Sequence, residues 1–250
     1  MKKYFVASDI HGFFSEWMMA LKDNGFDENN QEHIIILCGD IIDRGNESEK
    51  IINFLYDFPK ERRILIYGNH EELFLDMIYR GYSRGHDMTN GTYNTYKDLF
   101  KTDQIMSIEE FEKSKLCKLI EQTIDYYETK NYIFVHSWIP QDYLGYYNEY
   151  WNQGTSDLWH RARWCDSITE YFKNMNKTGK TIVSGHMFSA MAYLYEEIGK
   201  IAFLEYLNNY EKYSHLNKIY YGDKYINLDC NTYTSKIVQI LVLTEEDLNG

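Results

Sequence analysis

Short apolar runs alternate with segments of helical periodicity along the first quarter of the chain. Residues 3–8, 33–39 and 63–68 (KYFVAS, HIIILCG and RILIYG) are apolar runs that stop at glycine or a polar residue, as buried parallel strands do. Between them, residues 14–26 and 47–58 carry apolar side chains at helical spacing. This β-α-β-α-β alternation predicts a layered α/β fold with right-handed crossovers.

The rest of the chain predicts a helical excursion followed by more strands. A polar stretch at 83–100 leads into a helix expected from 108 to 127, which could cap a site, bind a partner or only pack. Residues 131–137 and 180–186 are predicted strands that stop at a histidine. Three later segments have strand-like patterns and predict a second, more antiparallel sheet packed on the first: 192–199, 225–233 and 235–247.

Composition narrows the class of protein. The chain has 250 residues, 44% of them hydrophobic and 26% charged, and no proline-rich linker divides it, so we expect a single domain over residues 1–250. The net charge of −12 argues against a nucleic acid polymer as partner, because a surface that holds a phosphate backbone is normally basic. The charge leaves open whether the excess carboxylates serve solubility or bind cations.

Neither a membrane nor an oxidising compartment is indicated. The first apolar run stops at Ser8-Asp9, which is too short for a signal-peptide core, and we expect no membrane partner. The four cysteines are scattered and form no Cys-x-x-Cys pair. We therefore expect a reduced, soluble, cytoplasmic protein.

Polar side chains gather where the predicted strands end. In chain order they are Asp9, His11, Asp40, Asp43, Arg44, Asn69, His70, His136 and His186. The carboxyl ends of strands form the ligand-binding edge of an open α/β sheet, so these side chains should converge. Each alone has an ordinary explanation, such as a turn or a helix cap, but five such strand ends together favour a functional site.

This set of side chains suits two metal ions. Carboxylate and amide oxygens attract hard divalent cations, and imidazole adds affinity for manganese, iron or zinc. Asp9 and His11 can turn toward one ion, and Asp40 can bridge to a second. Asn69, His136 and His186 would complete the coordination of the second ion. Two such ions lower the pKa of a water toward about 7 and clamp an in-line displacement at phosphorus.

The remaining polar residues fit phosphate-ester chemistry. Arg44 would grip two phosphate oxygens with its planar guanidinium. His70 could protonate the leaving oxygen while Asp43 holds its ring. We find no Cys-x5-Arg phosphate loop that would supply a cysteine nucleophile.

Three motifs point to a known family. Asp-x-His-Gly, Gly-Asp-x-x-Asp-Arg-Gly and Gly-Asn-His-Glu, followed by two single histidines, resemble the phosphoprotein phosphatase family of calcineurin-like metallophosphoesterases. The most similar branches are the bacterial and bacteriophage serine/threonine phosphatases and the symmetrical diadenosine tetraphosphate hydrolases. The resemblance implies a four-layer α/β/β/α sandwich of two mixed β-sheets flanked by helices, with a helical insertion around residues 82–130.

The resemblance also implies the ligands of a dinuclear metal centre. The cofactor would be two divalent metal ions, with Mn²⁺ expected and Fe or Zn as alternatives. The implied metal ligands are Asp9, His11, Asp40, Asn69, His136 and His186.

Catalytic and substrate-binding roles follow from the same motifs. His70 would be the general acid with Asp43 behind it, and Arg44 would bind the phosphate. A second phosphate arginine in the family follows a Trp-x-Arg pattern, which falls on Arg161 here, with Arg163 as the alternative. A further Asn-Gly stretch places Asn90 near the substrate.

Some positions depart from the family pattern without removing a ligand. Ser8 stands where glycine is usual, and Trp138 stands where glycine is common and is expected to narrow the cleft. Asp229 lies in Leu-Asp-Cys-Asn instead of Asp-Thr-Gly, which leaves its role open. The other histidines are expected to have surface or packing roles: His33, His86, His160 and His215.

Three functions remain open. The leading hypothesis is a metal-dependent phosphomonoester hydrolase, a serine/threonine protein phosphatase in which a metal-activated hydroxide attacks a phosphorylated protein or small phosphate ester. The first alternative is a symmetrical diadenosine tetraphosphate hydrolase, which should need more lysine or arginine near the metals. Lys113, Lys115 and Lys118 look instead like a solvated helix face. The second alternative is a non-catalytic binding module, although the intact ligand set argues against it.

Overall fold

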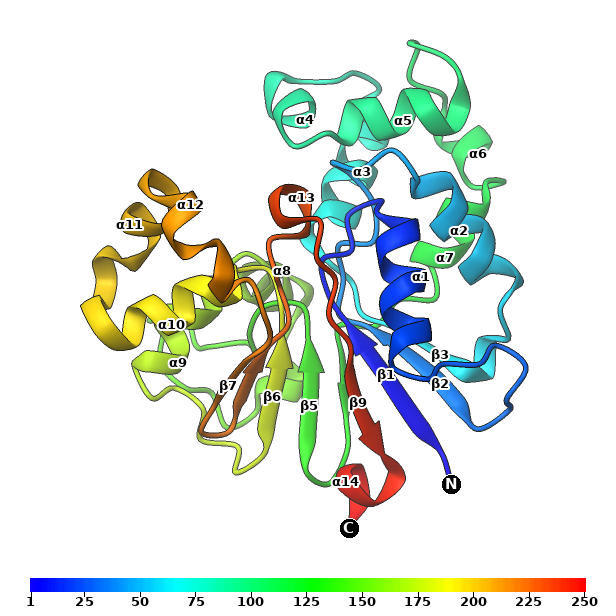
Figure 1. Cartoon of the computed structure of the whole chain (residues 1–250). Helices are drawn as coiled ribbons and strands as arrows, with labels where there is room; N and C mark the ends of the chain where they lie inside the picture. Colours follow the sequence, from blue (N-terminus) through cyan, green and yellow to red (C-terminus); the bar gives the residue numbers. More distant parts are fainter.

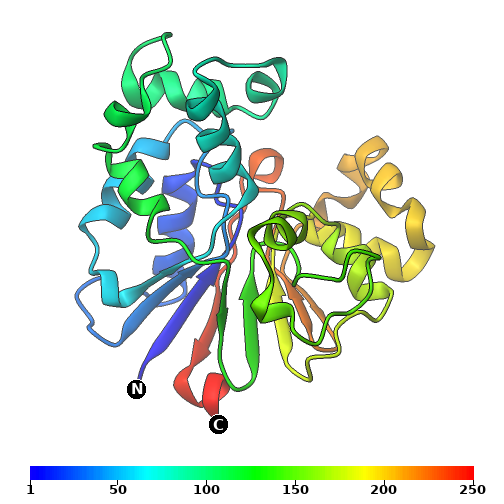
Figure 2. The same cartoon turned by 180° about the vertical axis from the view of Figure 1, so that it is seen from behind.

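Two β-sheets lie between outer layers of helices in the computed structural model, which describes residues 1–250 (Figures 1 and 2). The first sheet has the strand order β3-β2-β1-β9, in which β1, β2 and β3 are parallel and β9 pairs antiparallel with β1. Its strands are β1 (Lys3–Ala7), β2 (His33–Leu37), β3 (Arg63–Leu65) and β9 (Leu241–Thr244).

The second sheet is mixed, with the strand order β4-β5-β6-β8-β7. Its three central strands are parallel, and β4 and β7 are antiparallel edges. The strands are β4 (Tyr126–Glu128), β5 (Tyr132–Val135), β6 (Thr181–Ser184), β7 (Tyr220–Gly222) and β8 (Tyr225–Asn227).

Helices cover the outer face of each sheet (Figure 1). Those on the side of the first sheet are α1 (Phe14–Asp23), α2 (Ser48–Asp57), α3 (Asn69–Arg80), α4 (Gly85–Thr89), α5 (Thr92–Phe100), α6 (Ile108–Phe111) and α7 (Lys115–Ile120). Those on the side of the second are α8 (Ser156–Arg163), α9 (Ser167–Phe172), α10 (Ser189–Ile198), α11 (Ala202–Asn208) and α12 (Tyr210–Tyr213). Two short helices, α13 (Thr232–Ser235) and α14 (Glu245–Asn249), flank β9.

The alternation of residues along each strand creates the layers. Because successive side chains point to opposite faces, Phe5 and Ala7 of β1 pack on the helices while Tyr4 and Val6 enter the space between the sheets. Both sheets fill this inner layer, which contains Tyr4, Val6, Ile34, Ile36, Phe134, Val183, Ile226, Leu241 and Leu243. The expected four-layer α/β/β/α sandwich is confirmed.

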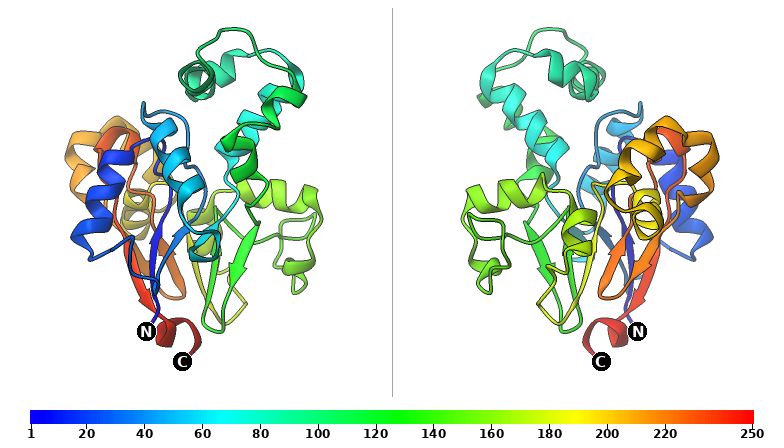
Figure 3. Two further views of the ribbon diagram at one scale, coloured as in Figure 1. Left: turned by 90° about the vertical axis from the view of Figure 1, so that its right-hand side faces the viewer. Right: turned by 90° about the vertical axis from the view of Figure 1, so that its left-hand side faces the viewer.

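The helical insertion is confirmed, but its internal structure differs from the prediction. Residues 82–130 contain α4 to α7, and α4 and α5 stand above the carboxyl ends of the parallel strands (Figure 3). The single helix expected over 108–127 is wrong. The Ser114 hydroxyl accepts the Cys117 N–H at 3.1 Å and starts a new helix, and residues 126–128 pair with β5 as a strand.

Two other strand predictions need correction. Residues 192–198 belong to helix α10, and Gly199 begins a short 3-10 helix. Met191, Ala192 and Leu194 form a buried helical face against the second sheet. Residues 235–247 do supply a strand, β9, but it joins the first sheet beside β1 instead of the second. Of the strand expected over 225–233, residues 225–227 form β8 of the second sheet, whereas residues 232–233 begin helix α13.

Two further observations concern membrane-spanning helices and disulfide bonds. No helix combines the length and apolar character needed to cross a bilayer. All four cysteines are free thiols.

Phe134 tests the inner layer. Its fully buried ring lies between the sheets, so Phe134→Ala should lower the free energy of unfolding by about 3–5 kcal/mol in urea denaturation. Met19→Ala is the control, because Met19 is 61% exposed on α1 and its loss should change stability by less than about 0.5 kcal/mol. Equal effects of the two substitutions would contradict this packing.

Candidate metal centre

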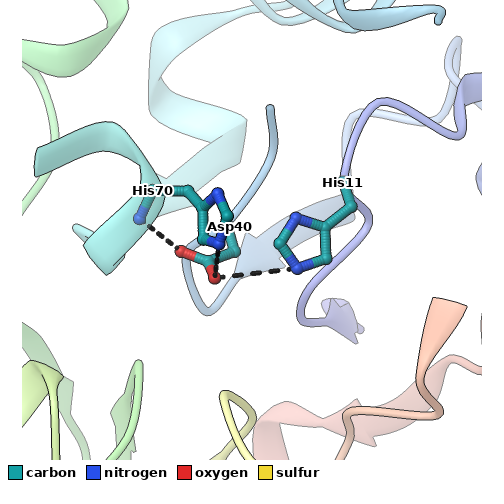
Figure 4. A group of neighbouring side chains, drawn as sticks. All are labelled: His11, Asp40 and His70. Atoms are coloured by element: carbon teal, nitrogen blue, oxygen red, sulfur yellow. Dashed lines mark hydrogen bonds and ion pairs between the residues drawn. The ribbon is translucent and has the colours of Figure 1, made fainter. Parts of the chain in front are cut away.

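Two groups of potential metal ligands meet at the carboxyl ends of the parallel strands and share one carboxylate. The first group is His11, Asp40 and His70 (Figure 4), and the second is Asp40, His136 and His186. Within each group the potential ligand atoms lie within 4.8 Å of one another. Asp40, at the end of β2, therefore stands between the two groups, as a bridging carboxylate would.

The loops that present these residues are strained. Asp9, His11, Asp40 and His186 all have positive φ values, of 51°, 44°, 54° and 67°. Residues other than glycine rarely adopt this left-handed region, and such strain persists only where surrounding contacts enforce it. The left-handed turns allow the chain to leave each strand abruptly and to aim its polar side chains into one space.

Buried carboxylates hold the strained loops in place. Glu71 accepts the backbone N–H groups of Asp40, Ile41 and Gly68 at 2.9, 2.9 and 3.1 Å. Asp9 accepts the N–H of His186 at 2.9 Å, which ties the end of β1 to the loop after β6. The two sheets are thus connected at the level of the candidate ligands.

Arg44 joins the two histidines of the first group. Its guanidinium donates to Nε2 of His11 at 2.9 Å and to Nε2 of His70 at 3.1 Å. A guanidinium only donates, so both Nε2 atoms carry lone pairs. Nδ1 of His11 accordingly donates to the Ile42 carbonyl at 3.1 Å. Nε2 of His11 also lies 3.7 Å from Asp40 and 3.8 Å from Asp9.

Acceptor atoms converge in the second group. Nδ1 of His136 lies 2.8 Å from the Cys38 carbonyl oxygen, which can only accept, so the opposite nitrogen of the neutral ring has a lone pair. That Nε2 is 2.7 Å from Asn69 Oδ1 and 3.4 Å from Asp40. Nδ1 of His186 approaches the same Asn69 oxygen to 3.0 Å.

This donor set fits divalent cations. Burial raises the pKa of Asp40 well above its ordinary value, because a carboxylate out of water needs a proton or a cation. Burial also lowers the pKa values of His11 and His186 well below normal, which favours the neutral imidazole that a metal requires. The oxygen and nitrogen atoms of the two groups face one another as acceptors, with too few N–H or O–H donors between them. A metal centre has this arrangement, because a cation binds the lone pairs.

A second polar unit adjoins this cluster. Nδ1 of His70 lies 2.8 Å from Oδ2 of Asp43, and the Thr92 hydroxyl donates to the same oxygen at 2.6 Å. Nε2 of His70 is 3.9 Å from Asp40. Asp43 and Thr92 therefore fix the imidazole with one nitrogen facing the cluster.

The two arginines predicted as the second phosphate ligand, Arg161 and its alternative Arg163, lie outside the cluster. The Arg161 guanidinium lies over the ring of Tyr143, 5.7 Å from its centroid, and borders a separate cavity of about 110 Å³. Arg163, the alternative, is paired with Glu72 at 2.9 Å and Asp125 at 2.7 Å. Both observations leave Arg44 as the arginine that reaches the cluster.

Asn90 lies near the cluster without a contact to its side chains. It ends α4, and its amide donates to the His86 carbonyl at 2.9 Å. The next residue, Gly91, packs on the backbone of Arg44 so closely that an added Cβ would lie 2.7 Å from its nitrogen. The insertion therefore reaches the cluster through Gly91 and Thr92.

Sequence reasoning missed several contributors. The sequence gives no separate role to Glu71 or to Thr92, although both support the site. Ser8 donates to Asp9 at 2.5 Å. Asp229 is buried, and burial together with the charge of Asp9 raises its pKa well above normal. No local sequence signal marks these contacts, because most join residues far apart in the chain.

The expectation that Trp138 narrows the cleft is wrong. Its side chain is 1% exposed and packs on Tyr225 in the core between the second sheet and its helices, with ring centroids 5.6 Å apart. Histidines outside the motifs behave as expected: His33 packs between Phe5 and Phe26, and His160 bonds to Glu72 at the surface.

Comparison with known proteins gives a consistent family. The family model described as calcineurin-like phosphoesterase matches residues 2–224. A symmetrical bis(5'-nucleosyl)-tetraphosphatase of Buchnera aphidicola is 38% identical over 81 residues, which are 32% of this chain and 28% of that protein. The asymmetrical bis(5'-nucleosyl)-tetraphosphatase PrpE of Bacillus cereus is 30% identical over 154 residues, 57% of this chain and 60% of that protein. The chain thus spans less than two thirds of each relative.

Solved structures resemble the fold. A cold-active protein-tyrosine phosphatase of a psychrophilic Shewanella species superposes with a TM-score of 0.61 over 98% of this chain and 76% of that one. The sequences are 15% identical, so the likeness concerns the fold alone.

The bridging position of Asp40 can be tested by metal content. Asp40→Asn keeps the side-chain shape and an oxygen to accept the His70 N–H, but removes the charge shared by both ligand groups. We expect the variant to lose at least one of two Mn²⁺ ions in elemental analysis after loading and desalting. Asp87→Asn is the matched control, because Asp87 is equally buried but pairs with Arg80 outside the cluster. Unchanged metal content in Asp40→Asn would contradict a bridging role.

Proposed function

The chain belongs to the calcineurin-like phosphoesterase family, and we propose that within it the protein is a metal-dependent phosphomonoester hydrolase of the protein-phosphatase type. One observation carries this proposal. A single arginine, Arg44, and a carboxylate-held histidine, His70, adjoin the two ligand groups that share Asp40. This arrangement provides for one phosphoryl group and one leaving oxygen.

The metal centre would supply the nucleophile. Asp9, His11, Asp40, Asn69, His136 and His186 would hold two divalent ions, which lower the pKa of water and polarise phosphoryl oxygens when bound. We expect Mn²⁺, with Fe or Zn as alternatives, because all three accept mixed carboxylate, amide and imidazole ligands.

The protein's own side chains complete the reaction. Arg44 would move its N–H donors from the histidines to two phosphoryl oxygens, where a planar guanidinium makes charge-assisted hydrogen bonds. Once Arg44 has moved away, Nε2 of His70 would take up a proton from solvent and then give it to the leaving oxygen, while Nδ1 stays on Asp43. Thr92, through Asp43, would keep the ring in this orientation.

The distribution of positive charge favours a monoester over a polyphosphate. A tetraphosphate chain would need several cations, and Arg44 is the arginine that contacts the cluster. Arg163 is neutralised by two carboxylates, and Lys115 bonds to Asn53 on α2. The serine/threonine specificity is a prediction. The role of Arg161 in phosphate binding is also a prediction, and it requires the guanidinium to leave the ring of Tyr143.

A second candidate is hydrolysis of dinucleoside polyphosphates. It is favoured by the names of two relatives, both of them bis(5'-nucleosyl)-tetraphosphatases. The same metal centre could serve both reactions, since each breaks a phosphorus–oxygen bond by in-line displacement.

A substrate panel separates the candidates. Metal-stripped protein with Mn²⁺ added back should release phosphate from p-nitrophenyl phosphate and from a phosphothreonine peptide, and should turn over diadenosine tetraphosphate more slowly at matched concentration. A much faster reaction with the tetraphosphate would overturn the protein-phosphatase proposal. Absence of metal-dependent turnover of all three would refute a phosphoesterase activity.

His70→Asn tests the general acid. The variant should retain its Mn²⁺ content and lose about 10²–10⁴-fold in kcat on a phosphothreonine peptide, whose leaving oxygen needs a proton. The loss should be smaller on p-nitrophenyl phosphate, because p-nitrophenolate leaves without one. Equal losses on the two substrates would show that His70 does not act as the acid.

A further inference from the structure

One partly buried carboxylate, that of Glu72, binds the end of α8 beside the candidate metal centre. Glu72, in the first turn of α3, accepts from Arg163 at 2.9 Å, from the Trp164 indole Nε1 at 2.7 Å and from His160 at 3.0 Å. These three residues, which we call the α8 clamp, lie in the last turn of α8 and directly after it. Asn69 and His70 occupy the same first turn of α3, so the clamp fixes the end of α8 next to the site.

The clamp holds Trp164 at the rim of the centre. The indole lies edge-to-face with the candidate ligand His186, with ring centroids 6.4 Å apart and planes at 79°. Trp164 is 37% exposed, whereas the other four tryptophans are at most 5% exposed. An aromatic ring that stays accessible although it is hydrogen-bonded and fixed is available to a ligand.

We propose that Trp164 is a specificity-determining residue that favours phosphate esters of aromatic alcohols, such as phosphotyrosine. The inference rests on the proposed phosphomonoesterase activity and names a substrate class for it. A phosphoryl group held by Arg44 and the metal centre would have its ester group directed toward the rim. An aryl group, attached directly to the ester oxygen, would reach the indole beside His186, whereas the short alkyl chain of phosphothreonine has no ring to pack there.

The geometry favours an aryl ester over a nucleotide. In a nucleotide, the base is separated from the phosphate by a ribose. Trp164 lies directly beside the candidate ligand His186, with ring centroids 6.4 Å apart. Two carboxylates, those of Glu72 and Asp125, pair with the single guanidinium of Arg163, so this group of side chains has an excess of negative charge. Such surroundings disfavour the remaining phosphates of a polyphosphate chain.

The test compares two phosphopeptides of one sequence, one with phosphotyrosine and one with phosphothreonine. Trp164→Ala should lower the ratio of kcat/KM values, tyrosine over threonine, by about three- to tenfold, mainly through KM, as expected for a lost aromatic contact. Trp164→Phe should restore most of the ratio. His160→Ala is the matched control, because it removes another member of the same clamp and should leave the ratio within about twofold.

The alternatives give different results. A change in rate that is equal for both peptides, or an unchanged ratio, would overturn the proposal and would assign Trp164 a structural role. A loss confined to diadenosine tetraphosphate, measured in parallel, would also overturn it and would indicate contact with a base. Metal-dependent hydrolysis of phosphothreonine peptide by the wild-type protein stands or falls separately, so failure of this inference is distinguishable from failure of the proposed function.

Discussion

The candidate site depends on one buried carboxylate that is not itself a candidate ligand. Glu71 accepts three backbone N–H groups, two from the loop after β2 and one from the loop after β3. Charge-assisted hydrogen bonds of this kind are about twice as strong as neutral ones. They hold Asp40 in its left-handed conformation, and they bring that loop so close to Gly68 that no other residue would fit there. Asn69 and His70, which follow Gly68, take their positions from this contact.

Strain and charge are concentrated in the same few residues. Left-handed conformations at Asp9, His11, Asp40, Asp43 and Arg44 cost of order 1–3 kcal/mol each, and several carboxylates are removed from water in one small volume. Fixed backbone donors offset part of this cost, as the N–H of His186 does for Asp9. Cations would offset much of the rest, since they neutralise buried carboxylates such as Asp40. A site built in this way is organised for ions before they arrive.

The sequence predicted what depends on short-range pattern and missed what depends on distant contacts. Strands β1, β2, β5 and β6 were predictable because their apolar runs stop at polar residues, and these polar residues do lie together. Helix α10 was mistaken for a strand because Ala-Tyr-Leu-Tyr alternates small or apolar residues with tyrosine, while the burial that decides the case comes from the sheet beneath. The hydrogen bond from Thr92 to Asp43 joins residues 49 positions apart, and the one from Trp164 to Glu72 joins residues 92 positions apart. No local sequence pattern predicts such contacts.

Substrate choice must come from outside the metal centre. The ligand set suits phosphomonoesters and polyphosphates equally, because both are attacked at phosphorus. What distinguishes them is the charge and shape of the rim, and here the rim is built by α3, α8 and the insertion. Glu72 and Asp125 cancel the charge of Arg163, and Glu72 also fixes Trp164, so one carboxylate both lowers the positive potential and presents an apolar ring. Under the proposed function, one arginine beside the metal ligands of a chain with a net charge of −12 would match a single phosphate better than a polyanion.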